Sequence, residues 1–202
     1  AIMGTPIFEH SLVSHVAYVT PAPFDSHQIG YLWVIPIQSS MSPEEKTARM
    51  RVHNIYDITL INIHQAYPGQ HTLSVKANQN ASKVRKTFHD PIFSQGWSFY
   101  CEEMLYTEEL YTDLETRLFQ LKDQLWRDYR TIIDSRLHLG QISYEEAVQI
   151  LVDKVKLDRG SAEAEVKRYT LFPTLGMGYL LGKREIVKLR QEMSDSLEDD
   201  NF

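Results

Sequence analysis

The chain has 202 residues, of which 43% are hydrophobic and 24% charged, and this composition is that of an ordinary globular protein rather than a disordered or fibrous one. Its formal net charge of -6, with Lys and Arg scattered along the chain, argues against a nucleic-acid binder. No apolar run approaches the roughly 20 residues of a membrane span, so we predict neither a nucleic-acid nor a membrane partner.

The first 41 residues predict short strands joined by loops. Aromatic and β-branched residues between prolines and a glycine predict one strand over His15–Thr20 and a second over Gln28–Ile35. Ser42 then caps a helix, because Ser at this position accepts backbone hydrogen bonds and the proline that follows suits a first helical turn. We predict that this helix continues to about Tyr67, where Pro68-Gly69 breaks or kinks it.

The remaining chain predicts a series of helices. Residues 97–139 are free of proline and glycine and are too long for one helix, so we divide them into helices over Trp97–Tyr111 and Asp113–Leu139. Further helices are predicted from Ser143 to about Arg159, from Ala162 to Tyr169, and from Gly178 to Met193. In the helix over Asp113–Leu139 we expect one apolar face to be buried. It consists of Leu114, Leu118, Leu121, Leu125 and Ile132.

The predicted fold class is therefore mainly α, with a short β-strand pair near the N-terminus. We expect a single domain over residues 1–202, with a strand and loop segment over 1–41 and a helical part over 42–202. The start has neither a basic region nor an apolar signal core, and the end, Glu198 to Phe202, is charged, which suggests a piece of a longer protein. Because Cys101 is the one cysteine, no internal disulfide forms, and a cytoplasmic location is slightly favoured while localisation stays open. With no neighbouring His or Lys in sequence, Cys101 is predicted to be a buried small hydrophobe rather than a nucleophile.

The segment from His64 to His71 has the outline of a helix-borne metal motif. In H-E-x-x-H hydrolases two His bind zinc and the Glu beside the first His is the general base. Here Gln65 holds that base position. An amide has nearly the shape of a carboxylate but cannot accept and return a proton at neutral pH. The segment therefore keeps the outline of the motif without its base.

Several segments, in the same order, resemble motifs of the bacterial "domain of unknown function 885" family. The matching segments are the strand pair of residues 17–37, His64–His71 against H-E-A-Y-P-G-H-H, Gln95–Glu102 against E-G-W-A-x-Y-x-E, Trp126–His138 against W-R-A-x-R-x-x-x-D-x-x-x-H, and Arg168–Tyr179 against R-Y-x-x-x-P-x-x-x-x-x-Y. The resemblance implies a zincin-like metallohydrolase fold, of which this chain is the carboxy-terminal part. It further implies a missing amino-terminal portion.

Carried over residue by residue, the resemblance implies that His64 and Gln70 stand at metal-binding positions and Gln95 at an acidic ligand position. Gln65 stands at the general-base position. Neutral glutamine is a poor zinc ligand, so we predict a catalytically degenerate, metallopeptidase-like domain without a bound cofactor. A peptide or another carboxylate-bearing molecule is the expected ligand.

Two alternatives stay open. An active hydrolase would bind zinc through His64, His71 and Glu102 or Glu103. It would need a sharp kink at Pro68-Gly69, because on an unbroken helix the two His would stand about 10 Å apart. The other alternative is a helical interaction module whose apolar face is covered by the missing amino-terminal portion or by a second copy in a homo-oligomer.

Five further residues are candidates for binding the ligand. Asp134 and His138, at helical i,i+4 spacing, either orient a substrate or form a simple side-chain pair. Arg168 and Tyr169, with Tyr179 downstream, suit a carboxylate, because guanidinium offers a bidentate fork and the phenol a further donor. The alternative for Arg168 is an ordinary surface arginine at a helix end.

Overall fold

The computed structural model describes residues 1–10, 16–39, 41–52 and 54–196 of the chain. These residues are mainly α-helical, with a small sheet near the N-terminus, which confirms the predicted fold class. The chain divides into two compact units, and α5 (Pro91–Thr107) contributes to both. Unit 1 consists of the described residues of Ala1–His89 together with Cys101–Thr116, and unit 2 of Asp90–Tyr100 and the described residues from Arg117 onward. The units therefore meet in sequence after residues 89, 100 and 116, and none of these points coincides with the division expected at residue 41.

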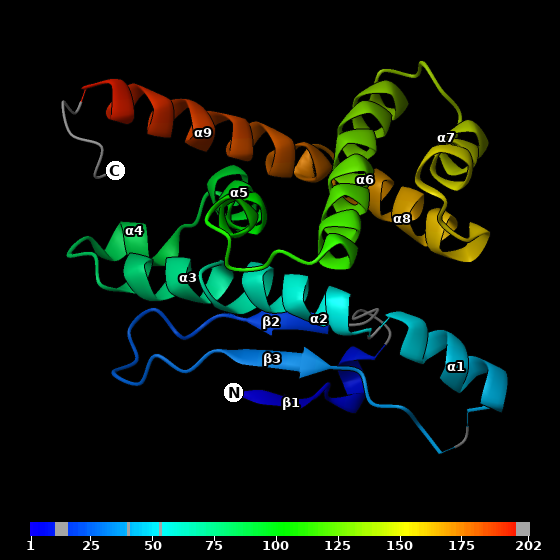
Figure 1. Cartoon of the computed structure of the whole chain (residues 1–202), viewed down its shortest axis with the longest axis horizontal. Helices are drawn as coiled ribbons and strands as arrows, with labels where there is room; N and C mark the ends of the chain where they lie inside the picture. The colour runs from blue at the N-terminus through cyan, green and yellow to red at the C-terminus, as the bar shows by residue number, and fades with distance from the viewer. Residues whose placement is uncertain (11–15, 40, 53, 197–202) are drawn as a thin grey trace. The chain divides into compact units, whose positions relative to one another are not determined.

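Unit 1 contains a mixed sheet with the strand order β1-β3-β2 (Figure 1). The strands are β1 (Ile2–Gly4), β2 (Val16–Val19) and β3 (Tyr31–Val34). β2 and β3 form the predicted strand pair and run antiparallel, with Val16 opposite Val34 and Val19 opposite Tyr31. The predicted start of the first strand at His15 lies outside the described residues. β1, which the sequence did not indicate, pairs in parallel with β3.

Unit 1 also contains helical elements. A 3-10 turn η1 (Ile7–Glu9) lies between β1 and β2, and β3 is followed by α1 (Pro43–Val52), α2 (Ile55–Ile61), the π-turn η2 (Asn62–Ala66), α3 (Gln70–Asn78) and α4 (Lys83–Thr87). α2 continues directly into η2, which contacts both β2 and α3 (Figure 1). The helix that carries the metal-type motif therefore packs beside the strand pair.

The single helix predicted to run from Ser42 to Tyr67 is wrong in its continuity. α1 ends at Val52 and α2 begins at Ile55, because the side chain of Asn54 accepts hydrogen bonds from the backbone N–H groups of Tyr56 and Asp57 and so caps a new helix. The predicted break at Pro68-Gly69 is confirmed, since η2 ends before it and α3 begins after it.

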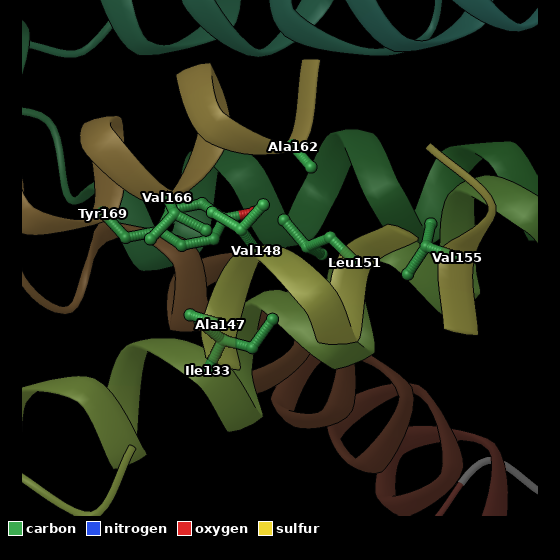
Figure 2. Close-up of a cluster of buried hydrophobic side chains, with 8 residues drawn as sticks. All are labelled: Ile133, Ala147, Val148, Leu151, Val155, Ala162, Val166 and Tyr169. Carbon is green, nitrogen blue, oxygen red and sulfur yellow. The ribbon is translucent and has the colours of Figure 1, made fainter. Parts of the chain in front are cut away.

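Unit 2 is built from helices. It contains the first part of α5, α6 (Leu114–His138) from Arg117 onward, α7 (Tyr144–Ile150), the π-turn η3 (Leu151–Val155), α8 (Arg159–Leu171), a 3-10 turn η4 (Leu175–Met177) and α9 (Gly178–Ser196). Its apolar core lies between α6, α7, η3 and α8 (Figure 2). The core residues are Ile133, Ala147, Val148, Leu151, Val155, Ala162, Val166 and Tyr169. None of the helices in the described part of the chain combines the length and apolar character that a bilayer crossing needs.

Three helix boundaries differ from their predictions for local reasons. α5 begins at Pro91 rather than Trp97, because the Asp90 carboxylate accepts from the backbone N–H of Ile92 at 2.8 Å and caps the helix early. The helix predicted to reach Arg159 ends at Val155, where Lys156 turns to a left-handed φ of 63°. α8 then begins at Arg159 rather than Ala162.

The predicted buried face of α6 is wrong. Its five apolar residues, Leu114, Leu118, Leu121, Leu125 and Ile132, are between 42% and 77% exposed. The buried positions of α6 are instead mostly polar: Thr116, Gln120, Arg130 and Asp134, together with Ile133. Two of these residues, Arg130 and Asp134, form ion pairs with Glu165 and His138.

Candidate functional site

A buried histidine–carboxylate pair lies in unit 1. His64 sits on the π-turn η2, and its Nδ1 lies 2.6 Å from Oε1 of Glu102 in the second part of α5. The side chains are only 9% and 1% exposed, respectively. A carboxylate at Nδ1 orients the imidazole ring and fixes its tautomer, so a metal-binding role for His64 would fall to Nε2. π-turns are frequent at functional sites.

The surroundings of Glu102 are also buried. The hydroxyl of Tyr111 donates to the backbone oxygen of Glu102 at 2.7 Å. Burial, reinforced by the charge of Glu102, raises the pKa of the Cys101 thiol to about 12. The thiol therefore stays protonated at neutral pH, and the prediction that Cys101 is a buried residue is confirmed.

The break after η2 requires glycine. The backbone N–H of Gly69 donates to the carbonyl of Ile63 at 3.0 Å, which folds Pro68-Gly69 back against the π-turn. A Cβ on Gly69 would lie 1.9 Å from the carbonyl oxygen of His64, a distance that no side chain tolerates. The position of His64 and the start of α3 are therefore coupled through this glycine.

A second histidine of the motif segment pairs with a strand residue. Nδ1 of His71, in the first turn of α3, lies 2.8 Å from the hydroxyl of Tyr18 on β2. Burial raises the pKa of Tyr18 to about 12, so the phenol is protonated at neutral pH. With a neutral imidazole, the phenol donates to Nδ1 and the ring proton resides on Nε2. Gly30 makes room for this pair, because a Cβ there would lie 2.6 Å from the Tyr18 oxygen and 2.9 Å from Nδ1 of His71.

This pair lines a pocket of about 340 Å³ within unit 1. The strand side of the pocket includes Tyr18, Gln28 and Gly30, and the motif side includes Asn62, Ala66 and His71. The described residues that line it include no Asp, Glu, Lys or Arg. The side chains that line the pocket are therefore mainly apolar, with a few hydrogen-bonding groups, which is the usual composition of a small-ligand site.

The three glutamines at the inferred metal and base positions are all partly buried. Gln65 lies on η2 beside His64, Gln70 is the first residue of α3, and Gln95 lies in the part of α5 that belongs to unit 2. Within the residues that the structure describes, no three His, Cys, Asp or Glu side chains gather to hold a metal ion. The zinc-dependent alternative through His64, His71 and Glu102 stays a prediction.

In unit 2 the predicted pair Asp134 and His138 is in contact. Nδ1 of His138 lies 2.8 Å from the backbone oxygen of Asp134 and 2.9 Å from its Oδ1. Burial raises the pKa of Asp134, and His138 partly offsets this rise. Asp134 is 1% exposed and lies beneath His138, which is itself exposed. The simple side-chain pair is therefore formed, and an orienting role for it stays a prediction.

The predicted carboxylate-binding residues of α8 are engaged by an internal carboxylate. Oε2 of Glu165 accepts from Nη2 of Arg168 at 3.0 Å and from the hydroxyl of Tyr169 at 2.9 Å. The same oxygen accepts from Nε and Nη2 of the buried Arg130 on α6, at 3.1 and 2.9 Å. Burial alone would lower the pKa of Arg130, but Glu165, with Tyr169 and Tyr179, raises it above its ordinary value. Glu165 thus joins α6 to α8.

Tyr179 completes this cluster as an aromatic partner of two arginines. The guanidinium carbons of Arg127 and Arg130 lie 5.4 and 5.5 Å from its ring centroid. Arg168, Tyr169 and Tyr179 line a common cavity of about 20 Å³, which is room for about one water molecule. The structure therefore brings these predicted residues together, around a small space.

Sequence reasoning missed two residues that organise these sites. Glu165 carried a usable signal, because it stands three residues before Arg168 and four before Tyr169, on the same helix face. Tyr18 carried none, since 53 residues separate it from His71.

These features define a mainly α protein whose small N-terminal sheet packs beside a histidine-bearing π-turn. The chain belongs to the family described as "Bacterial protein of unknown function (DUF885)", whose family model matches residues 2–202. This result confirms the family resemblance. No curated protein matches the chain.

Solved structures share the fold over the whole chain. One, from Colwellia psychrerythraea, is described as a "putative lipoprotein"; it aligns over 100% of this chain with a TM-score of 0.86 and 23% identity. Another, from Shewanella oneidensis, is described as "a putative lipoprotein of unknown function" and aligns over 100% of this chain with a TM-score of 0.83 and 28% identity. The chain covers 33% and 35% of those two chains, respectively, so it spans about a third of their length.

Proposed function

We propose that this chain is a metallohydrolase-like, zincin-like domain that has lost catalysis and retains a cleft for a peptide. In an active metallohydrolase, zinc polarises a carbonyl and activates water while a carboxylate accepts the proton. The observation that carries the proposal is the segment around His64: the imidazole is held by Glu102 at 2.6 Å, while Gln65 and Gln70 supply only amides. In this proposal the chain keeps one metal-ligand residue, His64, and lacks the carboxylate that would accept the proton.

The pocket beside this segment supports an uncharged stretch of peptide as ligand. His71 and Asn62 offer hydrogen-bonding groups next to apolar surface, and no acidic or basic side chain lines the described part of the pocket. In contrast, Arg168 already binds the carboxylate of Glu165. We therefore favour the peptide backbone over a free carboxylate as the group recognised.

Zinc binding tests the loss of catalysis. We expect the purified chain to hold no stoichiometric zinc after mild dialysis and to show no tight binding by calorimetry. The triple variant Gln65→Glu, Gln70→His, Gln95→Glu should gain zinc affinity and hydrolysis of a peptide library. A matched variant, Gln141→Glu with Gln149→Glu at exposed positions, should gain neither. Stoichiometric zinc in the unaltered chain would overturn the proposal.

Peptide binding tests the cleft separately. Capped neutral peptides should bind the unaltered chain, and Tyr18→Phe or His71→Ala should weaken that binding several-fold. Tyr31→Phe, which removes a phenol from an exposed position on β3, should leave binding unchanged. Equal affinities in all three variants would exclude this pocket as the site.

The active-hydrolase alternative makes a different prediction. It requires zinc held by His64, His71 and Glu102. The contact between His64 and Glu102 supports this alternative. His71→Ala would then abolish zinc binding and activity together, whereas the degenerate site has neither to lose.

A second candidate function, a helical interaction module, is favoured by the exposed apolar face of α6. Leu118, Leu121 and Leu125 are 66%, 45% and 42% exposed. The solved neighbours are about three times as long as this chain, which supports a further segment of a longer polypeptide as the cover; a second copy is the other cover. Light scattering should show that the chain self-associates and that the double variant Leu118→Ser with Leu125→Ser does not. A monomer at all concentrations would argue against a second copy as the cover.

The cytoplasmic location stays a prediction. The description of both solved neighbours as lipoproteins supports a membrane-attached location for their longer chains, and we extend this proposal to the present family member. Fractionation of cells that express the natural gene would decide between the two locations.

A further inference from the structure

One end of unit 1 carries exposed aromatic and basic side chains together. Phe24, in the connection between β2 and β3, is 62% exposed, and Val84 and Phe88, on and just after α4, are 65% and 75% exposed. Figure 1 shows α4 and this connection at the same end of the unit. We call this surface the α4 patch; it consists of Phe24, Lys83, Val84, Arg85, Lys86 and Phe88.

The charge of this region is opposite to that of the whole chain. From Ile58 to His89 the sequence contains no Asp or Glu, although the chain carries a net charge of -6. Within the same stretch lie Lys76 and the three cations of the α4 patch. The acidic residue nearest in the β2–β3 connection is Asp25, whose Oδ1 accepts from the backbone N–H of His27 at 2.8 Å. The patch is therefore locally cationic on an acidic protein.

Local contacts preform the patch. Nζ of Lys86 lies 5.9 Å from the centroid of the Phe24 ring, which links α4 to the β2–β3 connection. The side chain of Ser82 caps α4 by accepting from the backbone N–H of Arg85, and Asn80 in turn accepts from the backbone N–H of Ser82 at 2.9 Å. The aromatic and basic groups thus share one ordered surface.

We propose that the α4 patch docks on an anionic lipid surface. Exposed phenylalanine side chains gain free energy by entering the boundary between headgroups and acyl chains, while Lys and Arg beside them meet the headgroup phosphates. A polyanion such as a nucleic acid would satisfy the cations but would leave Phe24 and Phe88 in water. Charge complementarity and the aromatic exposure together therefore select a bilayer as the partner. The earlier prediction of no membrane partner concerned spanning segments, and a surface contact needs none.

Vesicle sedimentation of the whole chain tests this inference. Vesicles of phosphatidylglycerol and phosphatidylcholine should bind the chain, and vesicles of phosphatidylcholine alone should not. Each cation near such a surface contributes roughly fivefold to the partition constant, so Lys83→Gln with Arg85→Gln and Lys86→Gln should reduce it about a hundredfold. A matched variant that neutralises the exposed residues Lys154, Lys156 and Lys167 in unit 2 should bind as the unaltered chain does.

The phenylalanines separate lipid docking from simple charge attraction. Phe24→Ser with Phe88→Ser should reduce vesicle binding at least tenfold while circular dichroism and the melting curve stay unchanged, because both side chains are exposed. Vesicle binding that depends on the cations but not on the phenylalanines would overturn the proposal in favour of a soluble polyanion. Displacement by a DNA duplex to the same extent in the cation variant and in the phenylalanine variant would do the same. Absence of binding to anionic vesicles would refute it outright.

Discussion

Glu165→Gln should destabilise unit 2 strongly, because the Glu165 carboxylate forms an ion pair with the buried Arg130. Oε2 of this carboxylate lies 3.1 Å from Nε and 2.9 Å from Nη2 of Arg130, and it also accepts from Tyr169. The side chains of Arg130 and Glu165 are 10% and 16% exposed. Loss of one partner leaves the other charge buried and uncompensated, which costs about 3–5 kcal/mol.

We expect the lower end of this range, about 3 kcal/mol, because an amide oxygen preserves some of the hydrogen bonds and the carboxylate is not fully buried. For a protein of this size that corresponds to a fall of about 6–12 °C in melting temperature. Urea unfolding followed by circular dichroism measures the free energy, with each transition fitted separately if the two units unfold independently.

The matched control is Glu163→Gln, two residues earlier on α8. Glu163 pairs with Arg159, but these side chains are 46% and 53% exposed, so the loss should stay below about 1 kcal/mol. A double-mutant cycle with Arg130→Met isolates the pair, since the second substitution should cost little once the first is present. Equal effects of the two glutamate variants, or additivity in the cycle, would refute the role assigned to Glu165.

Three further outcomes follow from the described contacts. Gly182→Ala should lower the free energy of unfolding in urea by about 1–3 kcal/mol, because the new Cβ would lie 2.0 Å from the carbonyl oxygen of Ile92. The control, Gly160→Ala, places its Cβ no closer than 3.4 Å to any neighbour and should be neutral or stabilising. The free energy of unfolding should fall as pH rises from 9 toward 12. Burial raises the pKa of Cys101 to about 12, so in this range the folded state keeps a proton that the unfolded state loses. Cys101→Ala should flatten this dependence on pH, and an unchanged dependence would contradict the assignment. Tyr18→Phe should cost about 1 kcal/mol through loss of its hydrogen bond, and a neutral effect would show that the bond contributes nothing.

Local signals predicted much of the helical architecture. α6 begins within one residue of its predicted start at Asp113, whose carboxylate accepts from the backbone N–H of Thr116 at 2.8 Å. α7 follows Ser143 as expected, through the capping box of Ser143 and Glu146. Pro68-Gly69 ends the motif helix as expected. Each of these signals acts within four residues, which is why the sequence alone reveals it.

The rotation of α6 was not predictable from its pattern. A helical stripe of leucines normally marks the buried face, yet Leu118 and Leu125 are exposed while Arg130 and Asp134 are buried. The partner that holds Arg130 is Glu165, 35 residues away and on another helix. Periodicity cannot indicate a buried charge whose partner comes from so far along the chain.

The candidate site also contains features that the sequence indicated and contacts that it did not. The segment around His64 and the three glutamines were visible in sequence, and Glu102 was named there as an alternative zinc ligand beside His64. The hydrogen bonds that join Glu102 to His64 and Tyr18 to His71 were not predicted. Glu102 lies 38 residues from His64, and Tyr18 lies 53 residues from His71. Long-range hydrogen bonds of this kind depend on how the elements pack, and no local propensity encodes them.

Burial distinguishes His64 from the two glutamines beside it in the motif segment. Gln65 and Gln70 are only partly buried, so an amide in place of a carboxylate or imidazole costs the fold little. His64 and Glu102 are both enclosed, so removal of either one would leave a polar or charged group without its partner in a low-dielectric interior. The pair therefore contributes to stability whether or not a metal binds. The presence of His64 does not by itself argue for catalysis, and zinc affinity is the measurement that decides the function.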